Sequence, residues 1–138
     1  MEQNENLQNT FKISLNNDLI KIEMTKGVNN VTDNVKQAEL ISQGLQEILK
    51  NNQNQKFNCL VDLTLLGLSA HYPSPQARQI FAKMLDYEQI KKVAVLVPNS
   101  LLQSIMRFIV TISRKKERIE SFHNQSDALK WLAETKTD

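Results

Sequence analysis

The chain has 138 residues, of which 41% are hydrophobic and 23% are charged, and its formal net charge is +2. This composition predicts one globular domain whose core needs no disulfide or metal. The near balance of charge argues against nucleic acid or an anionic membrane as a partner, and a single cysteine excludes an intrachain disulfide. The acidic, amide-rich start and the lack of an apolar run of about 20 residues predict a cytoplasmic chain without a transmembrane segment.

The first third of the sequence predicts a hairpin followed by a helix. Residues 1–10 are polar and are expected to form a disordered tail. Apolar and polar side chains alternate over residues 11–15 and 20–24, on either side of a turn rich in asparagine and aspartate. This pattern is typical of two antiparallel strands with one solvent-exposed face. Thr32 is expected to be the N-cap of a helix, since apolar residues then recur at helical spacing to about residue 50.

The centre of the chain predicts a strand, a helix and a second strand. Residues 57–63 and 92–97 are short apolar runs with β-branched residues, as in strands that are covered on both faces. Between them, Ser74 and Pro75 form a strong helix start, with Ser74 as N-cap and Pro75 at the first helical position. This unit favours a parallel sheet with a helical crossover.

The last third predicts a helix over residues 100–116, a short strand over residues 119–122 and a final helix capped by Asn124 or Ser126. The predicted fold class is therefore α/β, with a mixed, mostly parallel five-stranded sheet and the element order β-β-α-β-α-β-α-β-α. If consecutive strands lie side by side, right-handed crossovers place every connecting helix on one face of the sheet. Because the central strands need cover on both faces, either the strand order reverses or another surface covers the second face.

The predicted domain organisation is a single domain over residues 11–134, with a short C-terminal tail over residues 135–138. We find no internal repeat in the sequence.

The loop that follows the first central strand is a candidate site, with Asp62, Ser69, His71 and Tyr72 at the sheet edge. Asp62 ends a strand, where α/β sheets place ligand-contacting residues, but the acidic pair and lysine of a receiver domain are missing. We favour hydrogen bonds from the following loop to Asp62. His71 and His123 lack nearby carboxylate or cysteine ligands, so we expect no metal site. No nucleophile elbow or phosphate-binding glycine cluster is present, so we expect no enzyme and no cofactor.

Two further side chains have structural interpretations. The hydroxyl of Ser74 lies at a helix N-terminus, where a phosphate would be electrostatically favoured, yet a simple helix cap is the preferred interpretation over a regulatory serine. Cys59 lies inside an apolar strand and is expected to be a small buried core residue.

The helix predicted over residues 100–116 contains a candidate interface. At 100° per residue its apolar side chains span an arc of about 200°, whereas packing on a sheet needs a stripe of about 100°. Leu102, Met106 and Val110 lie toward one margin of this arc. Either the loop around residues 65–68 folds over this margin, or the margin forms the interface of a two-fold homodimer.

Together these elements resemble the STAS domain, the fold of the sporulation anti-sigma-factor antagonists, with residues 60–63 on the central strand. The second half is similar to the SpoIIAA-like (STAS/CRAL-TRIO-like) proteins in its middle helix, in residues 93–97 and in its ending. In that ending, residues 119–122 are followed by Asp-Ala-Leu-Lys-Trp-Leu at residues 127–132. The antagonists carry a phosphorylatable serine in an Asp-Ser-Ser-Gly motif, which residues 70–75 of this chain lack, so the phosphoswitch is not implied.

The resemblance implies a noncatalytic binding or regulatory module rather than an enzyme. Our leading hypothesis is a cytoplasmic module that acts through protein–protein interaction or self-association. The alternative hypothesis is a carrier or sensor of a small apolar, lipid-like ligand, in a pocket lined by the third helix and by Leu65, Leu66, Leu68 and Tyr72. A small hydrolase with Ser69, Ser74 or Cys59 as nucleophile ranks last.

Overall fold

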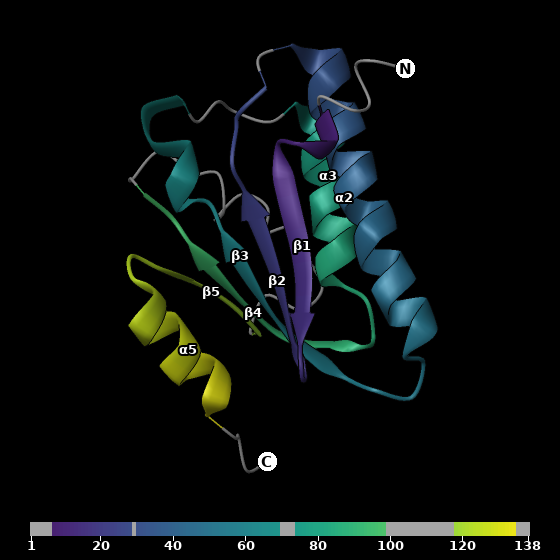
Figure 1. The fold of residues 1–138 in the computed structure, drawn as a ribbon, viewed down its shortest axis with the longest axis vertical. Coiled ribbons are helices and arrows are strands. Elements are labelled where there is room, and N and C mark those ends of the chain that lie inside the picture. The colour runs from purple at the N-terminus through teal and green to yellow at the C-terminus, as the bar shows by residue number, and fades with distance from the viewer. Residues whose placement is uncertain (1–6, 29, 70–73, 99–117, 135–138) are drawn as a thin grey trace.

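The computed structural model describes residues 7–28, 30–69, 74–98 and 118–134, which are drawn in colour in Figure 1. The elements in chain order are the strands β1 (Phe11–Asn16) and β2 (Leu19–Met24), the helix α2 (Val31–Asn51), the strand β3 (Phe57–Asp62), the 3-10 helix η1 (Thr64–Ser69), the helix α3 (Pro75–Leu85), the strands β4 (Ile90–Leu96) and β5 (Ile119–Phe122), and the helix α5 (Gln125–Ala133). The helix expected over residues 100–116 lies outside the described residues. None of the described helices is both long and apolar enough to cross a membrane.

The strands form one sheet in the order β1-β2-β3-β4-β5. β1 pairs antiparallel with β2, and the remaining neighbours pair in parallel. The predicted α/β class with a mixed, mostly parallel five-stranded sheet is therefore confirmed. The hairpin turn is also confirmed: Asn17 has a φ of 57°, a left-handed conformation that asparagine tolerates well.

The helices lie on both sides of the sheet, with α2 and α3 packed together on one face and α5 on the other (Figure 1). The described strands lie side by side in the order in which they follow in the sequence, so the strand order does not reverse among them. The second face is covered instead by α5, which follows the last strand and connects no pair of strands. This arrangement resolves the conflict between one-sided crossovers and central strands that are buried on both faces.

The larger core cluster lies between the sheet and the pair α2 and α3. It is built from alternate residues of the strands, such as Ile20, Phe57 and Val95, together with Ile41 and Leu45 of α2. Gly44 permits this close packing, because a Cβ atom at its position would lie 2.7 Å from Cδ1 of Ile13. The glycine that weakens α2 by its conformational freedom therefore allows the helix to lie directly on β1.

The smaller core cluster lies under α5. It joins Leu60 of β3 and Leu96 of β4 to Ala128 and Leu132 of the helix. Lys92 strengthens the end of this helix, since its Nζ donates to the carbonyl oxygens of Trp131 and Glu134 at 2.8 and 2.7 Å. A cation at a helix C-terminus is favoured by the helix dipole, and here it adds to the hydrogen bond that the Trp131 carbonyl accepts from the backbone N–H of Glu134 at 3.2 Å.

Two boundaries differ from the sequence-based expectation. The N-cap of α2 is Asn30 and not Thr32: the Oδ1 atom of Asn30 accepts a hydrogen bond from the backbone N–H of Asp33 at 2.8 Å. Leu7–Thr10, assigned above to a tail, is part of the fold. Leu7 is buried, Thr10 bonds to the carbonyl of Leu7 through its hydroxyl, and the backbone carbonyl of Thr10 accepts from the N–H of Thr25 at 2.8 Å.

Candidate functional site

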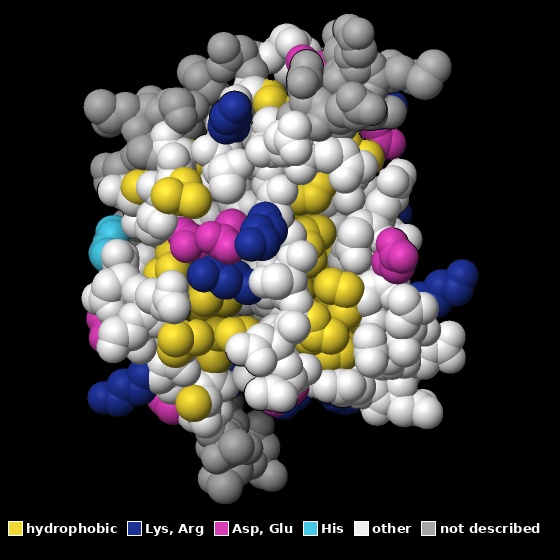
Figure 2. Space-filling view, in the orientation of Figure 1, with side chains coloured by type: hydrophobic (Ala, Val, Ile, Leu, Met, Phe, Trp, Pro, Cys, Tyr) yellow, Lys and Arg dark blue, Asp and Glu magenta, His cyan; other side chains and the backbone are white. Residues whose placement is uncertain are grey.

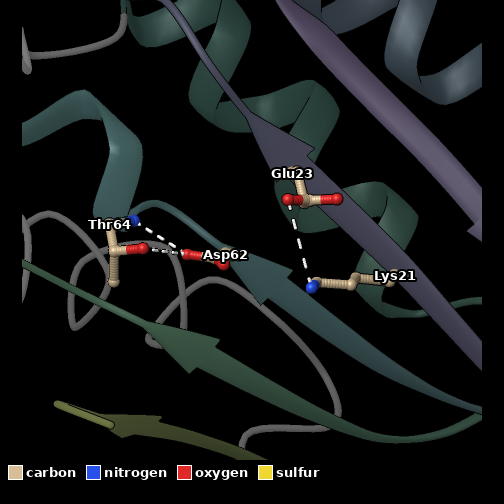
Figure 3. A network of polar contacts seen from close by, with 4 residues as sticks. All are labelled: Lys21, Glu23, Asp62 and Thr64. Carbon is tan, nitrogen blue, oxygen red and sulfur yellow. Dashed lines mark hydrogen bonds and ion pairs between the residues drawn. The ribbon is translucent and has the colours of Figure 1, made fainter. Parts of the chain in front are cut away.

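Asp62 ends β3 beside η1 and is only 8% exposed. Its Oδ1 atom accepts hydrogen bonds from the backbone N–H of Thr64 at 2.9 Å and from the Thr64 hydroxyl at 2.5 Å (Figure 3). The carboxylate therefore holds the first turn after the strand, which is the role that the sequence favoured for it.

A row of charged side chains crosses the sheet at the level of Asp62. Glu23 on β2 is in register with Asp62, and Lys12 on β1 is in register with Glu23. Neighbouring residues in register share a face of the sheet, so the three side chains lie on the α5 face. Lys21 is on the same face, and its Nζ lies 4.0 Å from Oε2 of Glu23 (Figure 3). Sequence alternation places each residue on a face, but only the pairing register brings the row together.

Ser74 is the N-cap of α3. Its hydroxyl oxygen accepts from the backbone N–H of Ala77 at 3.2 Å, and its own backbone N–H donates to Oδ1 of Asn34 at 2.8 Å. Ser74 is only 8% exposed, because it is held between α3 and α2. The helix cap expected at Ser74 is therefore present, and the preference for a cap over a regulatory serine stays a prediction.

Several sequence-predicted residues cannot be placed. Ser69 is the last residue of η1, and its side chain lies outside the described part of the chain. His71 and Tyr72 lie outside the described residues altogether. The candidate interface residues Leu102, Met106 and Val110 also lie outside the described residues. The helix-mediated homodimer therefore stays a prediction.

The residues expected to line an apolar pocket fall into different environments. Leu66 is buried in the larger core cluster, while Leu65 is 58% exposed on η1. The side chain of Leu68 is not among those described. The carrier hypothesis also stays a prediction, which native mass spectrometry of protein purified from its own host would test.

Cys59 is buried in β3, and burial raises the pKa of its thiol from 9.0 to about 12. An apolar environment disfavours the thiolate, which is the nucleophilic form of cysteine. Within the described ranges, no group of three or more histidine, cysteine, aspartate or glutamate side chains is arranged to hold a metal ion.

The buried thiol predicts a pH dependence of stability. In the unfolded chain the thiol of Cys59 loses its proton near pH 9, whereas in the folded chain the pKa is about 12. The folded state therefore binds more protons between these values, and stability falls as the pH rises above 9, by up to about 1.4 kcal/mol per pH unit. Urea unfolding should show that the free energy of unfolding falls more between pH 8 and pH 10.5 for the wild type than for Cys59→Ala. Equal losses would mean that the thiol is exposed.

The comparison with protein-family models gives one family. No curated protein matches the chain. The family model described as "Domain of unknown function (DUF7793)" matches residues 13–136. The match runs from within β1 to beyond α5, so it includes the row of charged side chains on β2 and β3. The chain therefore belongs to the family of this domain of unknown function.

Proposed function

We propose that the chain is a noncatalytic, cytoplasmic binding module that acts through protein–protein contact, with a different protein or with a second copy. The observation that carries this proposal is the part of the α5 face over β1 and β2, which lies beyond the strands that α5 packs over. α5 packs over β3, β4 and β5, whereas Lys12 and Ser14 of β1 are exposed on this face and Lys21 and Glu23 of β2 are half-buried. We call these side chains the open sheet face, which consists of Lys12, Ser14, Lys21 and Glu23.

The open sheet face has the chemistry of a protein-binding surface. Figure 2 shows charged side chains of both signs near its centre and hydrophobic side chains on either side. Leu65 of η1 is largely exposed, and Leu19, on the same face of β2 as Lys21, is half-buried. The ion pair of Lys21 and Glu23 is half-buried and long at 4.0 Å, so it contributes little and leaves both charges able to pair with a partner. Mixed charges beside apolar contacts favour orientation and specificity in protein recognition.

Three of the candidate side chains have structural roles. Asp62 holds the turn into η1, Ser74 caps α3, and Cys59 is enclosed in the core. These assignments support a noncatalytic module. Its relationship to the STAS and SpoIIAA-like families is part of the proposal and is supported by the β-β-α-β start and by the parallel order of β2, β3, β4 and β5.

A photo-crosslinking experiment tests the open sheet face. A benzoylphenylalanine at Ser14, which is exposed on this face, would be activated in the host cell, and the captured peptides would be identified by mass spectrometry. The exchange Lys21→Glu with Glu23→Lys reverses both charges and preserves the net charge. We expect capture of a defined partner peptide by the otherwise unchanged chain, and a fall of about fivefold or more after the exchange.

The matched control is Lys36→Glu with Glu39→Lys, a charge exchange at two exposed positions of α2. This variant should retain capture, and thermal unfolding should show that both exchanges leave the fold intact. Equal capture in both exchange variants, or capture of no defined peptide, would overturn the proposed function.

A further inference from the structure

β1 lies at one edge of the sheet, and no described strand pairs with its outer side. The hairpin register and the bond from the N–H of Thr25 to the carbonyl of Thr10 show which residues of β1 bond to β2: Lys12, Ser14 and Asn16. The backbone groups of Phe11, Ile13 and Leu15 therefore point away from the sheet. These groups have no hydrogen-bond partner among the described residues. The outer side of β1 is a row of backbone donors and acceptors.

The same three residues present apolar side chains on the α2 face. Phe11 and Ile13 are half-buried against the core, and Leu15 is 41% exposed. Leu40 and Ile48, one turn before and after Gly44 on α2, are also half-buried. We call this set the edge strip: Phe11, Ile13, Leu15, Leu40 and Ile48. Figure 2 shows a run of hydrophobic side chains between β1 and α2 along the strand.

β1 has few of the features that keep edge strands apart. Natural edges are usually short, bulged, interrupted by proline or guarded by charged side chains, lysine above all. β1 has six residues, no proline and an uninterrupted register with β2. Its one charged residue, Lys12, points to the open sheet face, away from the edge strip. By contrast, β5 at the opposite edge has four residues and carries Glu120.

The edge is complementary to itself. If two copies of β1 pair antiparallel about a two-fold axis at Ile13, each Ile13 faces its counterpart, and each Phe11 faces Leu15 of the second copy. All three residues then exchange backbone hydrogen bonds, about six in total, and the two edge strips meet on one face. On the other face Lys12 lies opposite Ser14 of the second copy, so no like charges are directly opposed. A shift by one residue would destroy this match.

We propose that the chain forms a two-fold homodimer through antiparallel pairing of its β1 strands, which joins the two sheets into one continuous sheet. This proposal rests on the proposed binding function and names one partner, a second copy of the chain. The interface is isologous, as expected for a closed dimer. It differs from the helix-mediated dimer predicted at Leu102, Met106 and Val110, because its contacts come from β1 and α2.

Light scattering after gel filtration tests the dimer with two charge variants. Leu15→Lys places a charge against Phe11 of the second copy, and the dimer dissociation constant should rise by about tenfold or more. Ser14→Lys places a lysine opposite Lys12 of the second copy, at two symmetric positions, and should raise the dimer dissociation constant about threefold. Ser14→Glu places an opposite charge there and should lower this constant by a similar factor. Val31→Lys, at an exposed residue of α2, is the control and should leave the dimer unchanged.

A disulfide experiment tests the register. Lys12 and Ser14 of the second copy form a non-hydrogen-bonded pair, whose Cα atoms lie about 4.5 Å apart, close enough for a disulfide. A mixture of the Lys12→Cys and Ser14→Cys chains should therefore form a covalent dimer under mild oxidation, more than either chain alone. Cys59 is enclosed and should not contribute.

The outcomes separate this inference from the proposed function. A wild-type chain that is monomeric at about 100 μM overturns the strand dimer, while capture of a different protein at Ser14 would still support the binding function. A dimer that Leu15→Lys does not weaken also overturns it and points to another interface. Loss of dimer without loss of the thermal unfolding transition in Leu15→Lys supports it.

Discussion

Phe57→Ala is expected to lower the free energy of unfolding by about 3–5 kcal/mol. Phe57 is fully buried at the start of β3, and it is among the largest enclosed side chains of the described chain. Its removal leaves a cavity in the larger core cluster between the sheet and the pair α2 and α3. The backbone bond from its N–H to the carbonyl of Gln89 at 2.7 Å holds the strand in place, so little collapse can offset the loss.

Urea unfolding measures this effect as a lower midpoint with an unchanged slope, and the melting temperature should fall by about 10 °C. Val31→Ala is the control, since Val31 is exposed at the start of α2, and its effect should stay within about 0.5 kcal/mol. A loss below about 1 kcal/mol for Phe57→Ala would contradict the packing of this face.

Leu60→Ala is expected to lower the free energy of unfolding by about 2–5 kcal/mol. Leu60 lies on the opposite face of the same strand from Phe57. Leu60 is buried in the smaller core cluster, where it packs with Ala128 and Leu132 of α5. This cluster has few members, so the loss of one large side chain removes much of the apolar contact that holds the helix. Hydrogen exchange should therefore show a selective loss of protection in α5, beyond the overall loss of stability.

The control for this variant is Leu129→Ala, at a residue of α5 whose side chain is 37% exposed, and it should leave α5 protected. Because Phe57 and Leu60 lie on opposite faces and belong to different clusters, the double variant should lose the sum of the two effects within about 0.5 kcal/mol. Strong coupling between them, or equal loss of protection throughout the chain, would mean that the two faces do not pack as separate layers.

Features that depend on near neighbours in the sequence were predictable. The hairpin required only alternation and a turn of asparagine and aspartate, and Asn17 indeed has a positive φ. Ser74 and Pro75 start α3 as expected, and Asn124, one of two predicted caps, caps α5. In each case the stabilising contact joins residues at most a few positions apart, so the residue types are sufficient.

The N-terminal boundary and the cap of α2 were not predictable in this way. Thr10 belongs to a polar segment, but its hydroxyl accepts a hydrogen bond from Nε2 of the buried Gln37 at 2.9 Å. This contact joins residues far apart in sequence, so composition alone indicates a tail. Asn30 and Thr32 are both good N-caps. The path of the chain from β2 decides between them.

The sequence by itself determined the fold class, the hairpin and the helix starts, because periodicity and capping are local properties of the chain. Only the tertiary structure decided which face of the sheet α5 covers and which side chains meet across the strands. The row of Lys12, Glu23 and Asp62 depends on the register of three strands, and the outer side of β1 is open because no other described strand pairs with it. Register and edge position arise from the packing of the whole domain, since a shift of one residue would turn every buried side chain to the opposite face.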